Sequence, residues 1–289
     1  MKYYSYFPGC AVEATASALG LSVPHVAKEL DMDLIELDDW NCCGSSPYGS
    51  VDKLEAACMA ARNLALAEKR GFDLVTPCSS CYITLNRANA HLKEYPALRD
   101  QVDQALAAGN LDYHGGVRVR HIAEVLYNDI TPEVIGAKVT KSLNGLKVAP
   151  YYGCQLVRPG FGFDDPESPH SLDELVASLG ADAVSWPLKT RCCGGSLIMS
   201  EEDLALELSN KLLHNVQENG AQCIVTDCPL CQINLDAYQS RVNSKFKTKY
   251  HLPVLFLSQL IGVALGIKPD ALGLQRNIVS PMRVLAPYL

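Results

Sequence analysis

No block of like charge and no basic stripe appears in this sequence, whose formal net charge is −7. Nucleic-acid binding, which favours basic surfaces with interleaved aromatic residues, is therefore not expected. The sequence also lacks an apolar run of the roughly 20 residues that a bilayer span needs. Its most apolar stretch, Leu255 to Ile267, is interrupted by Ser258 and Gln259. Because the N-terminus shows no secretory signal, we expect a cytoplasmic protein without a direct membrane span.

Two common redox motifs are absent as well. The sequence has no Cys-x-x-Cys-x-x-Cys run of the ferredoxin type and no strand-linked Gly-x-Gly-x-x-Gly. Gly160 and Gly162 have the spacing of two such glycines but stand in a Pro/Gly-rich loop, Arg158 to Pro166. Any electrons used by this chain therefore have to come from another protein.

Cysteine is plentiful, with twelve residues, and ten of them form an internal repeat. Each half has a lone cysteine, a Cys-Cys-Gly motif and a Cys-x-x-Cys motif, in that order. The CC pairs and the Cys-x-x-Cys motifs share one offset of 150 residues, as from Cys42 to Cys192. The two lone cysteines, Cys10 and Cys154, are separated by six residues fewer than this offset. The Pro/Gly-rich loop lengthens the segment between the lone cysteine and the CC pair in the second half. We interpret the halves as homologous modules.

Each module shows the same alternation of short strands and helices. A second strand, Leu34 to Leu37 or Ala183 to Trp186, precedes the CC pair, and an Ala/Leu-rich helix follows it. The pattern predicts an α/β protein of two homologous Rossmann-like βαβ modules, residues 1–145 and 146–289. In such parallel sheets the functional residues gather at the carboxyl ends of the strands, where these cysteines stand.

Two segments lie outside the repeated pattern. Residues 96–145 are predicted to form a helical connector, in which Val117 to Tyr127 is the most periodic segment. The tail after Gly266 is predicted to be irregular and to act as a docking strap.

Three kinds of site compete for each group of five cysteines. Adjacent cysteines pair badly with each other, which disfavours a disulfide framework in a reducing compartment. A structural zinc site takes four ligands and would leave one cysteine unused. A cubane [4Fe–4S] cluster also takes four thiolates, so five predict either an extra thiol beside the cluster or a cluster that is not an ordinary cubane. Spacing favours iron–sulfur ligation.

Cys58 and Cys223 have no counterparts in the other half. We interpret both as small buried hydrophobic residues rather than ligands.

The pattern Cys10, Cys42-Cys43-Gly44 and Cys78-x-x-Cys81, repeated later in the chain, resembles the cysteine-rich CCG domain that is duplicated in the HdrB family of heterodisulfide reductases. The resemblance implies two noncubane [4Fe–4S] clusters, each held by five cysteines. It assigns one cluster to Cys10, Cys42, Cys43, Cys78 and Cys81, and the other to Cys154, Cys192, Cys193, Cys228 and Cys231.

The resemblance also implies an activity and partners. The substrate would be a small-molecule disulfide, which in methanogens is coenzyme M joined to coenzyme B, bound between the two clusters. Electrons would come from a ferredoxin-like HdrC-type protein with cubane clusters, fed by a flavin-containing HdrA-type protein. Opening a disulfide requires two electrons, and we expect each cluster to supply one of them. No residue stands out as the proton donor.

The two halves differ in charge near the CC pairs. Lys189 and Arg191 precede Cys192, whereas Asp38 and Asp39 precede Cys42. A positive neighbourhood favours an added electron. We therefore expect the second-half cluster to have the higher reduction potential and to lie nearer an anionic group of the substrate.

Two alternatives remain for function. The chain would be an electron-transfer component of a related complex, either sulfur-oxidising or linked to quinones or dehydrogenases, acting on another thiol or disulfide or on no substrate of its own. A zinc-binding scaffold without catalytic activity is the alternative of a different class.

Overall fold

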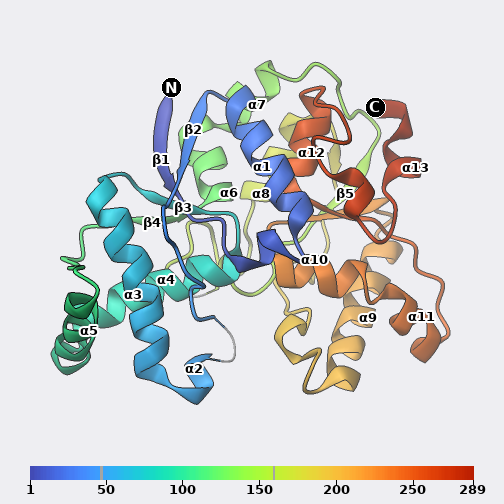
Figure 1. The fold of residues 1–289 in the computed structure, drawn as a ribbon. Coiled ribbons are helices and arrows are strands. Elements are labelled where there is room, and N and C mark those ends of the chain that lie inside the picture. The colour runs from blue at the N-terminus through green and yellow to red at the C-terminus, as the bar shows by residue number, and fades with distance from the viewer. Residues whose placement is uncertain (46–47, 159) are drawn as a thin grey trace. The chain divides into compact units, whose positions relative to one another are not determined.

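The computed structural model describes residues 1–45, 48–158 and 160–289 (Figure 1). The described chain divides into two compact units, neither of which is one continuous segment. The first contains Met1–Cys10 and Asp31–Ile122, and the second contains Ala11–Leu30 and Ala123–Leu289.

The first unit is built on a parallel sheet with the strand order β2-β1-β3-β4. Its strands are β1 (Lys2–Tyr6), β2 (Met32–Glu36), β3 (Leu74–Thr76) and β4 (Val119–His121). Its helices are α2 (Tyr48–Val51), α3 (Lys53–Arg70), α4 (Ser79–Glu94) and α5 (Pro96–Ala108). Helix α3 contacts both α4 and α5. Strands β3 and β4 are buried along their whole length, as expected for parallel strands covered on both faces.

Local sequence explains where the longest of these helices begins and ends. The Asp52 carboxylate accepts hydrogen bonds from the backbone amides of Leu54 (2.8 Å) and Glu55 (2.9 Å), which caps the N-terminus of α3. The helix ends at Gly71, whose φ of +78° is a left-handed conformation that glycine adopts without steric cost. The next helix but one, α5, has Pro96 at its first position, where no amide hydrogen is needed.

The second unit repeats this topology, with a parallel sheet of order β6-β5-β7-β8. Its strands are β5 (Lys147–Pro150), β6 (Asp182–Ala183), β7 (Cys223–Thr226) and β8 (Val254–Phe256). Its main helices are α1 (Ser17–Glu29), α7 (Pro132–Ala137), α8 (Ser171–Ser178), α9 (Glu202–Glu218), α10 (Pro229–Asp236), α11 (Gln239–Phe246) and α12 (Leu257–Ala264). The matching strand orders confirm the predicted α/β fold of two similar modules.

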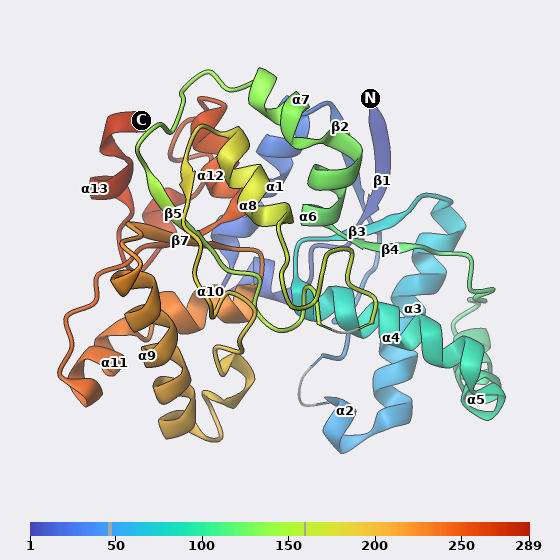
Figure 2. The same cartoon turned by 180° about the vertical axis from the view of Figure 1, so that it is seen from behind.

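Shorter helical elements complete the chain. The 3₁₀ turn η1 (Cys10–Glu13) precedes α1, and α6 (Ile122–Val125) runs into the π-helical turn η2 (Leu126–Ile130). The tail forms η4 (Leu274–Arg276), α13 (Met282–Leu285) and η5 (Ala286–Tyr288). The tail is therefore less irregular than the sequence predicted. Figure 2 shows the second unit from behind, with α8 beside α7, which it contacts.

Helix α1 belongs to the second unit because it packs against α12 (Figure 1). The hydroxyl oxygens of Ser22 and Ser258 lie 2.7 Å apart in this contact, and both residues are buried. Gly273 comes so close to α1 that a Cβ atom on it would lie 3.1 Å from the Cα of Ala18. The division of the sequence into modules 1–145 and 146–289 stays a prediction about the repeat, distinct from these compact units.

Two expected elements differ from the structure. The prediction that Val117 to Tyr127 belongs to a helical connector was wrong for the first part of this segment, because Val119–His121 forms β4 and pairs with β3. Tertiary strand pairing overrides the helical periodicity here. The second strand of the later half ends at Ala183 instead of Trp186, since only Asp182 and Ala183 pair with β5.

No helix in the described ranges is both long enough and apolar enough to cross a bilayer.

Candidate functional site

The first five predicted cysteines converge at the carboxyl ends of β1, β2 and β3. Cys10 follows β1, the pair Cys42 and Cys43 follows β2, and Cys78 is the N-cap residue of α4, directly after β3. The sulfur atoms of Cys10 and Cys42 lie 3.7 Å apart, and those of Cys43 and Cys81 lie 3.4 Å apart. Thiol contacts between Cys42 and Cys43, and between Cys78 and Cys81, join these pairs into one set of five.

The second five form the same arrangement in the other unit. Cys154 follows β5, Cys192 and Cys193 follow β6, and Cys228 is the N-cap residue of α10 after β7. The sulfur atoms of Cys193 and Cys231 lie 3.6 Å apart. Further thiol contacts link this pair to the remaining three cysteines. The structure thus brings together all ten predicted residues in two sets of five.

Burial follows the same pattern in both sets. In each, the second cysteine of the CC pair and both cysteines of the Cys-x-x-Cys motif are buried. The lone cysteine and the first of the CC pair are exposed or half-buried. A group bound by either set would therefore be enclosed on one side and accessible along the edge formed by Cys10 and Cys42, or by Cys154 and Cys192.

Thiol–thiol hydrogen bonds distribute the negative charge unevenly within each set. Hydrogen bonds with the Cys42 thiol, and then with the Cys81 thiol, lower the pKa of Cys43, while the pKa of Cys42 is raised in return. In the second set, donation from Cys154 and Cys193 lowers the pKa of Cys192. Thiolates are the form that binds metals, so each set already favours an anionic sulfur at its CC pair.

Two glycines let the backbone approach the sulfur atoms closely. A Cβ atom on Gly9 would lie 3.0 Å from Cys81 Sγ, and one on Gly153 would lie 3.2 Å from Cys231 Sγ. Both residues have positive φ, +81° and +66°. Any side chain at these positions would therefore occupy space directly beside the thiols.

Buried amides and hydroxyls hold the two CC loops, and sequence reasoning missed them. In the first unit the Asn63 side chain accepts from the Asn41 backbone amide (3.0 Å) and donates to the Asn41 carbonyl (2.9 Å). In the second, Asn234 and Ser209 both donate to the Cys193 carbonyl, at 2.6 and 3.2 Å. The available signal was a fully buried polar residue on an otherwise apolar helix face.

Two buried aromatic residues, Tyr151 beside the second thiol set and His121 beside the first Cys-x-x-Cys motif, were not predicted. The buried Tyr151 hydroxyl donates to the Arg191 carbonyl at 2.7 Å and so ties the strand end to the second CC loop. The neighbouring thiols contribute to the raised pKa of Tyr151, after burial itself. His121 is fully buried, its Nε2 3.4 Å from the Ser79 hydroxyl and its ring edge-on to Tyr82.

Lys189, predicted as a charge that tunes the site, forms an ion pair. Its ammonium nitrogen lies 3.0 Å from the Asp173 carboxylate and donates to the Pro169 carbonyl at 2.6 Å. The Lys189 carbonyl accepts from the amides of Tyr152 and Gly153, at 3.0 and 3.1 Å. Lys189 therefore holds the loop that carries Cys154, and its charge is largely neutralised.

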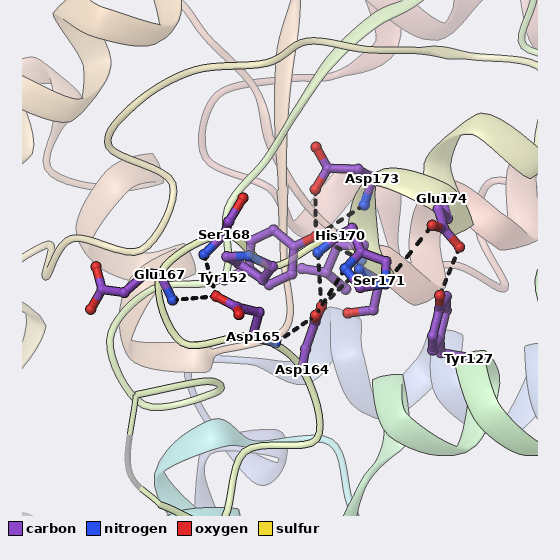
Figure 3. A network of polar contacts seen from close by, with 12 residues as sticks. Tyr127, Tyr152, Asp164, Asp165, Glu167, Ser168, His170, Ser171, Asp173 and Glu174 are labelled. Atoms are coloured by element: carbon purple, nitrogen blue, oxygen red, sulfur yellow. Dashed lines mark hydrogen bonds and ion pairs between the residues drawn. The ribbon is translucent and has the colours of Figure 1, made fainter.

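A polar network continues from this ion pair along the N-terminus of α8 (Figure 3). The Tyr152 hydroxyl donates to Asp173 and accepts from the Leu172 amide at 2.9 Å. The Asp164 carboxylate accepts from the amides of His170 (3.0 Å) and Ser171 (2.8 Å). These contacts order the Pro/Gly-rich loop of the second half; Pro159 of that loop lies outside the described residues.

The acidic residues of the first half are paired as well. Asp39 forms a salt bridge with Arg62, and Asp38 lies 2.5 Å from Arg70. Arg191, in contrast, is exposed and immediately precedes Cys192. Arg191 is therefore the remaining charge on which the predicted difference between the two halves depends.

The two remaining cysteines stand apart from both sets. Cys223 is fully buried at the start of β7, and burial raises its pKa to about 12. Cys58 is half-buried on α3, where burial and the nearby Asp52 raise its pKa. Both thiols stay protonated and packed at neutral pH.

The donor sets fit iron–sulfur binding. Each provides five soft thiol ligands, a helix N-terminus at the Cys-x-x-Cys motif and a glycine that leaves room beside the sulfur atoms. Within residues 1–45, 48–158 and 160–289, no group of three or more His, Cys, Asp or Glu side chains has the geometry of a site for a single metal ion. Fold and sites together define a duplicated cysteine-rich α/β protein.

Comparison with known proteins shows which family this cysteine-rich protein belongs to. The family described as "Cysteine-rich domain" (CCG) matches residues 4–86 and 148–236. The HdrB component of a ferredoxin- and F420H2-dependent CoB-CoM heterodisulfide reductase from Methanosarcina acetivorans is 35% identical over 99% of this chain and 97% of its own. The chain belongs to the HdrB family of heterodisulfide reductases, with its cysteine-rich domain present twice, and is a heterodisulfide-reductase-type subunit.

Another relative carries a different name. A protein of Wolinella succinogenes called 8-methylmenaquinol:fumarate reductase membrane anchor subunit is 37% identical over 98% of this chain and 99% of its own. Among solved structures, a hypothetical protein from Helicobacter pylori has the same fold, with a TM-score of 0.79 at 17% identity over 96% of this chain. The present chain spans 52% of that protein's chain.

Proposed function

We propose that the chain is the catalytic subunit of a heterodisulfide-reductase-type complex and reductively cleaves a small-molecule disulfide of the CoM-S-S-CoB kind. The observation that carries this proposal is the pair of matching thiol sets, each with three buried and two accessible cysteines. The relatives named as HdrB components of heterodisulfide reductases support it.

Each set is proposed to hold one noncubane [4Fe–4S] cluster through all five cysteines. A cubane cluster has four irons and takes four terminal thiolates, which leaves the fifth thiol of each set without a role. The thiol contacts join all five cysteines in each set, and none of the five stands apart. Ligation by five thiolates accounts for this arrangement.

When bound, each cluster supplies one electron of the two that reduction of a disulfide requires. The chain's own residues hold the sites in place. Gly9 and Gly153 keep side chains away from the sulfur atoms, and Asn63 and Asn234 fix the backbone of the two CC loops. Cys10 and Cys192 are exposed, so a substrate sulfur can approach each site from the solvent side.

The proposal includes partners that deliver the electrons. The relatives are named as single components of larger reductases, so this chain is proposed to associate with a ferredoxin-like HdrC-type protein. Through that partner it would receive electrons from a flavin-containing HdrA-type protein, in the cytoplasm. The described chain has no cysteine motif beyond its two sets that would accept electrons directly.

An anaerobic reconstitution tests the proposal. The purified chain is combined with its HdrC-type partner, reduced dye and candidate disulfides, and thiol release is followed alongside cluster EPR. We expect dye oxidation that depends on the disulfide, with two thiols released per two electrons. A matched preparation with Cys43→Ser and Cys193→Ser should show neither. A colourless protein carrying zinc, without acid-labile sulfide, would refute the proposal.

Electron transfer without disulfide chemistry is a second candidate, favoured by the relative named as a membrane anchor subunit of a quinol:fumarate reductase. In that case the two clusters would be reduced and reoxidised by partner proteins while every disulfide tested failed to reoxidise them. Stopped-flow reoxidation of the reduced chain, with disulfide or with an oxidised quinone analogue, separates the two functions.

A further inference from the structure

A cavity of about 600 Å³ lies in the first unit beside the first CC loop. It begins at Gly44, which directly follows Cys43, and extends between α3 and α4 to Leu98 on α5. These helices lie next to one another in Figures 1 and 2, and their contacts agree. Its volume falls in the range of roughly 300 to 1,000 Å³ typical of sites for small molecules.

Small side chains on two helix faces create this space. On α3 the lining residues are Lys53, Ala56, Ala57 and Ala60, and on α4 they are Thr84, Arg87, Ala88 and His91. Both groups follow the i, i+3, i+4, i+7 spacing of a single helix face. Alanine at four of these eight positions leaves room that longer side chains would fill.

The charge of the cavity wall has one sign. Lys53 and Arg87 carry this positive charge, His91 also lines the cavity, and no Asp or Glu is among the lining residues in the described part of the chain. The nearby Asp52 carboxylate is engaged by the amides of Leu54 and Glu55. The N-terminus of the 18-residue helix α3, at Lys53, adds the positive end of its dipole.

The second half of the chain provides an internal comparison, because the flanking cysteines align the helices residue by residue. Lys53 corresponds to Asp203, and the alanines 56, 57, 60 and 88 correspond to Leu206, Glu207, Asn210 and Tyr238. Acids of that half are paired with bases, Asp203 with Lys245 at 2.5 Å and Glu202 with Arg241 at 2.7 Å. At the positions of Lys53 and the four alanines, the second half therefore has an acid and larger side chains, where the first half has a cation and open space.

We propose that this cavity binds a small organic anion bearing phosphate or carboxylate groups. Lys53 and Arg87 contact its charged groups, His91 adds a further donor, and the alanines and Leu98 contact its apolar part. Such a site goes beyond disulfide cleavage, since anion binding by α3 and α4 does not require turnover at either cysteine set. Its position against Gly44 places the anion beside the first CC loop.

Isothermal titration calorimetry on the anaerobically purified holoprotein tests this proposal. The probes are inorganic phosphate, pyrophosphate and citrate, which separate phosphate from carboxylate recognition. Saturable binding of at least one probe is expected, weakened about tenfold or more by Arg87→Gln or Lys53→Gln, since each removes a charge-assisted hydrogen bond. Ala57→Glu, which copies Glu207 of the second half, should abolish binding.

Lys93→Gln is the matched control, because Lys93 is an exposed cation on α4 that does not line the cavity. It should bind the probe like the wild type, and all variants should retain wild-type iron content and thermal stability. Absence of saturable binding for every probe overturns the proposal. An affinity of Arg87→Gln for the probe equal to that of the wild type also overturns it. If no probe binds and Arg87→Gln instead loses affinity for a partner protein, the cavity wall is a protein-docking surface.

Discussion

A Cβ atom on Gly9 would lie 3.0 Å from the sulfur of Cys81, closer than real Cβ atoms ordinarily approach a neighbour. The backbone of Gly9 has a φ of +81°, a value that residues other than glycine adopt only with strain. The same relationship recurs between Gly153 and Cys231, at 3.2 Å. At both positions, the left-handed backbone and the absence of a side chain leave room for the sulfur atoms.

Gly9→Ala should therefore reduce cluster occupancy in the first half. The measurement is iron and acid-labile sulfide per chain, with EPR of the remaining cluster. Gly71→Ala is the matched control, because Gly71 has a φ of +78° but no atom near its Cβ position. Both variants should lose about 1–2 kcal/mol of stability from the left-handed conformation, and only the first should lose iron. Equal iron content in both would contradict the role given to Gly9.

Cys43→Ser should remove the cluster of the first half and leave the second. Cys43 contacts both Cys42 and Cys81, so its loss separates the two parts of the thiol set. We expect iron and sulfide to fall to about half of the wild-type value, as a cluster bound in each unit requires. Cys58→Ser, on the same unit but outside the set, should retain the full content. A variant of Cys43 with unchanged iron would show that this residue is not a ligand.

Arg191→Gln should lower the reduction potential of the second-half cluster. Arg191 is exposed beside Cys192, and removing its charge makes an added electron less favourable, by on the order of 10 mV because solvent screens the interaction. Potentiometric EPR of the variant measures the shift. Arg241→Gln, which removes an exposed cation paired with Glu202, should leave the potential unchanged. A first-half cluster with the higher potential in the wild type would contradict the expectation from the charge difference.

Ionisation of the Asp236 carboxyl should lower the free energy of unfolding as pH rises through about 6. Burial raises the pKa of this carboxyl from 3.8 to about 6, against the hydrogen bonds it accepts from the amides of Ile278 (2.7 Å) and Val279 (3.1 Å). A raised pKa means that the folded state binds the proton more tightly than the unfolded state does. The stabilisation is complete at low pH and is lost as the folded carboxyl ionises.

Between about pH 5 and pH 7 this loss amounts to about 1 kcal/mol. Denaturant unfolding of wild type and Asp236→Asn across that interval, under anaerobic conditions, isolates the contribution. The free energy of unfolding of Asp236→Asn should depend on pH less steeply than that of the wild type, by that amount. Asp270→Asn, at an exposed position, serves as the control. A pH dependence that is identical in wild type and Asp236→Asn would rule out this residue as its source.

The sequence allowed the fold class and the gathering of the cysteines to be predicted, because both follow from a repeat with fixed spacing. Cys42 and Cys192 had to occupy equivalent places once the modules were homologous, and the strand–helix alternation placed them at strand ends. Because the cysteines recur at the same offset in two homologous modules, few arrangements of them in the fold are possible.

Features that depend on distant partners could not be predicted in this way. Lys189 was interpreted as an open charge, but Asp173 lies 16 positions away and neutralises it. The segment Val119–His121 looked helical, and its pairing with β3 made it a strand. The cavity beside Gly44 escaped notice because alanine spacing shows a helix face without showing what the face encloses.

The packing of α1 on α12 has a consequence for how the two halves depend on each other. Leu19, Val23 and Val26 of α1 are all buried, and the helix that covers them lies almost at the other end of the sequence. A fragment ending at residue 145 would leave that surface bare to water and would be expected to aggregate. A fragment that begins at residue 146 would expose the matching surface of α12, so we expect a fragment of either half to depend on the other half for solubility.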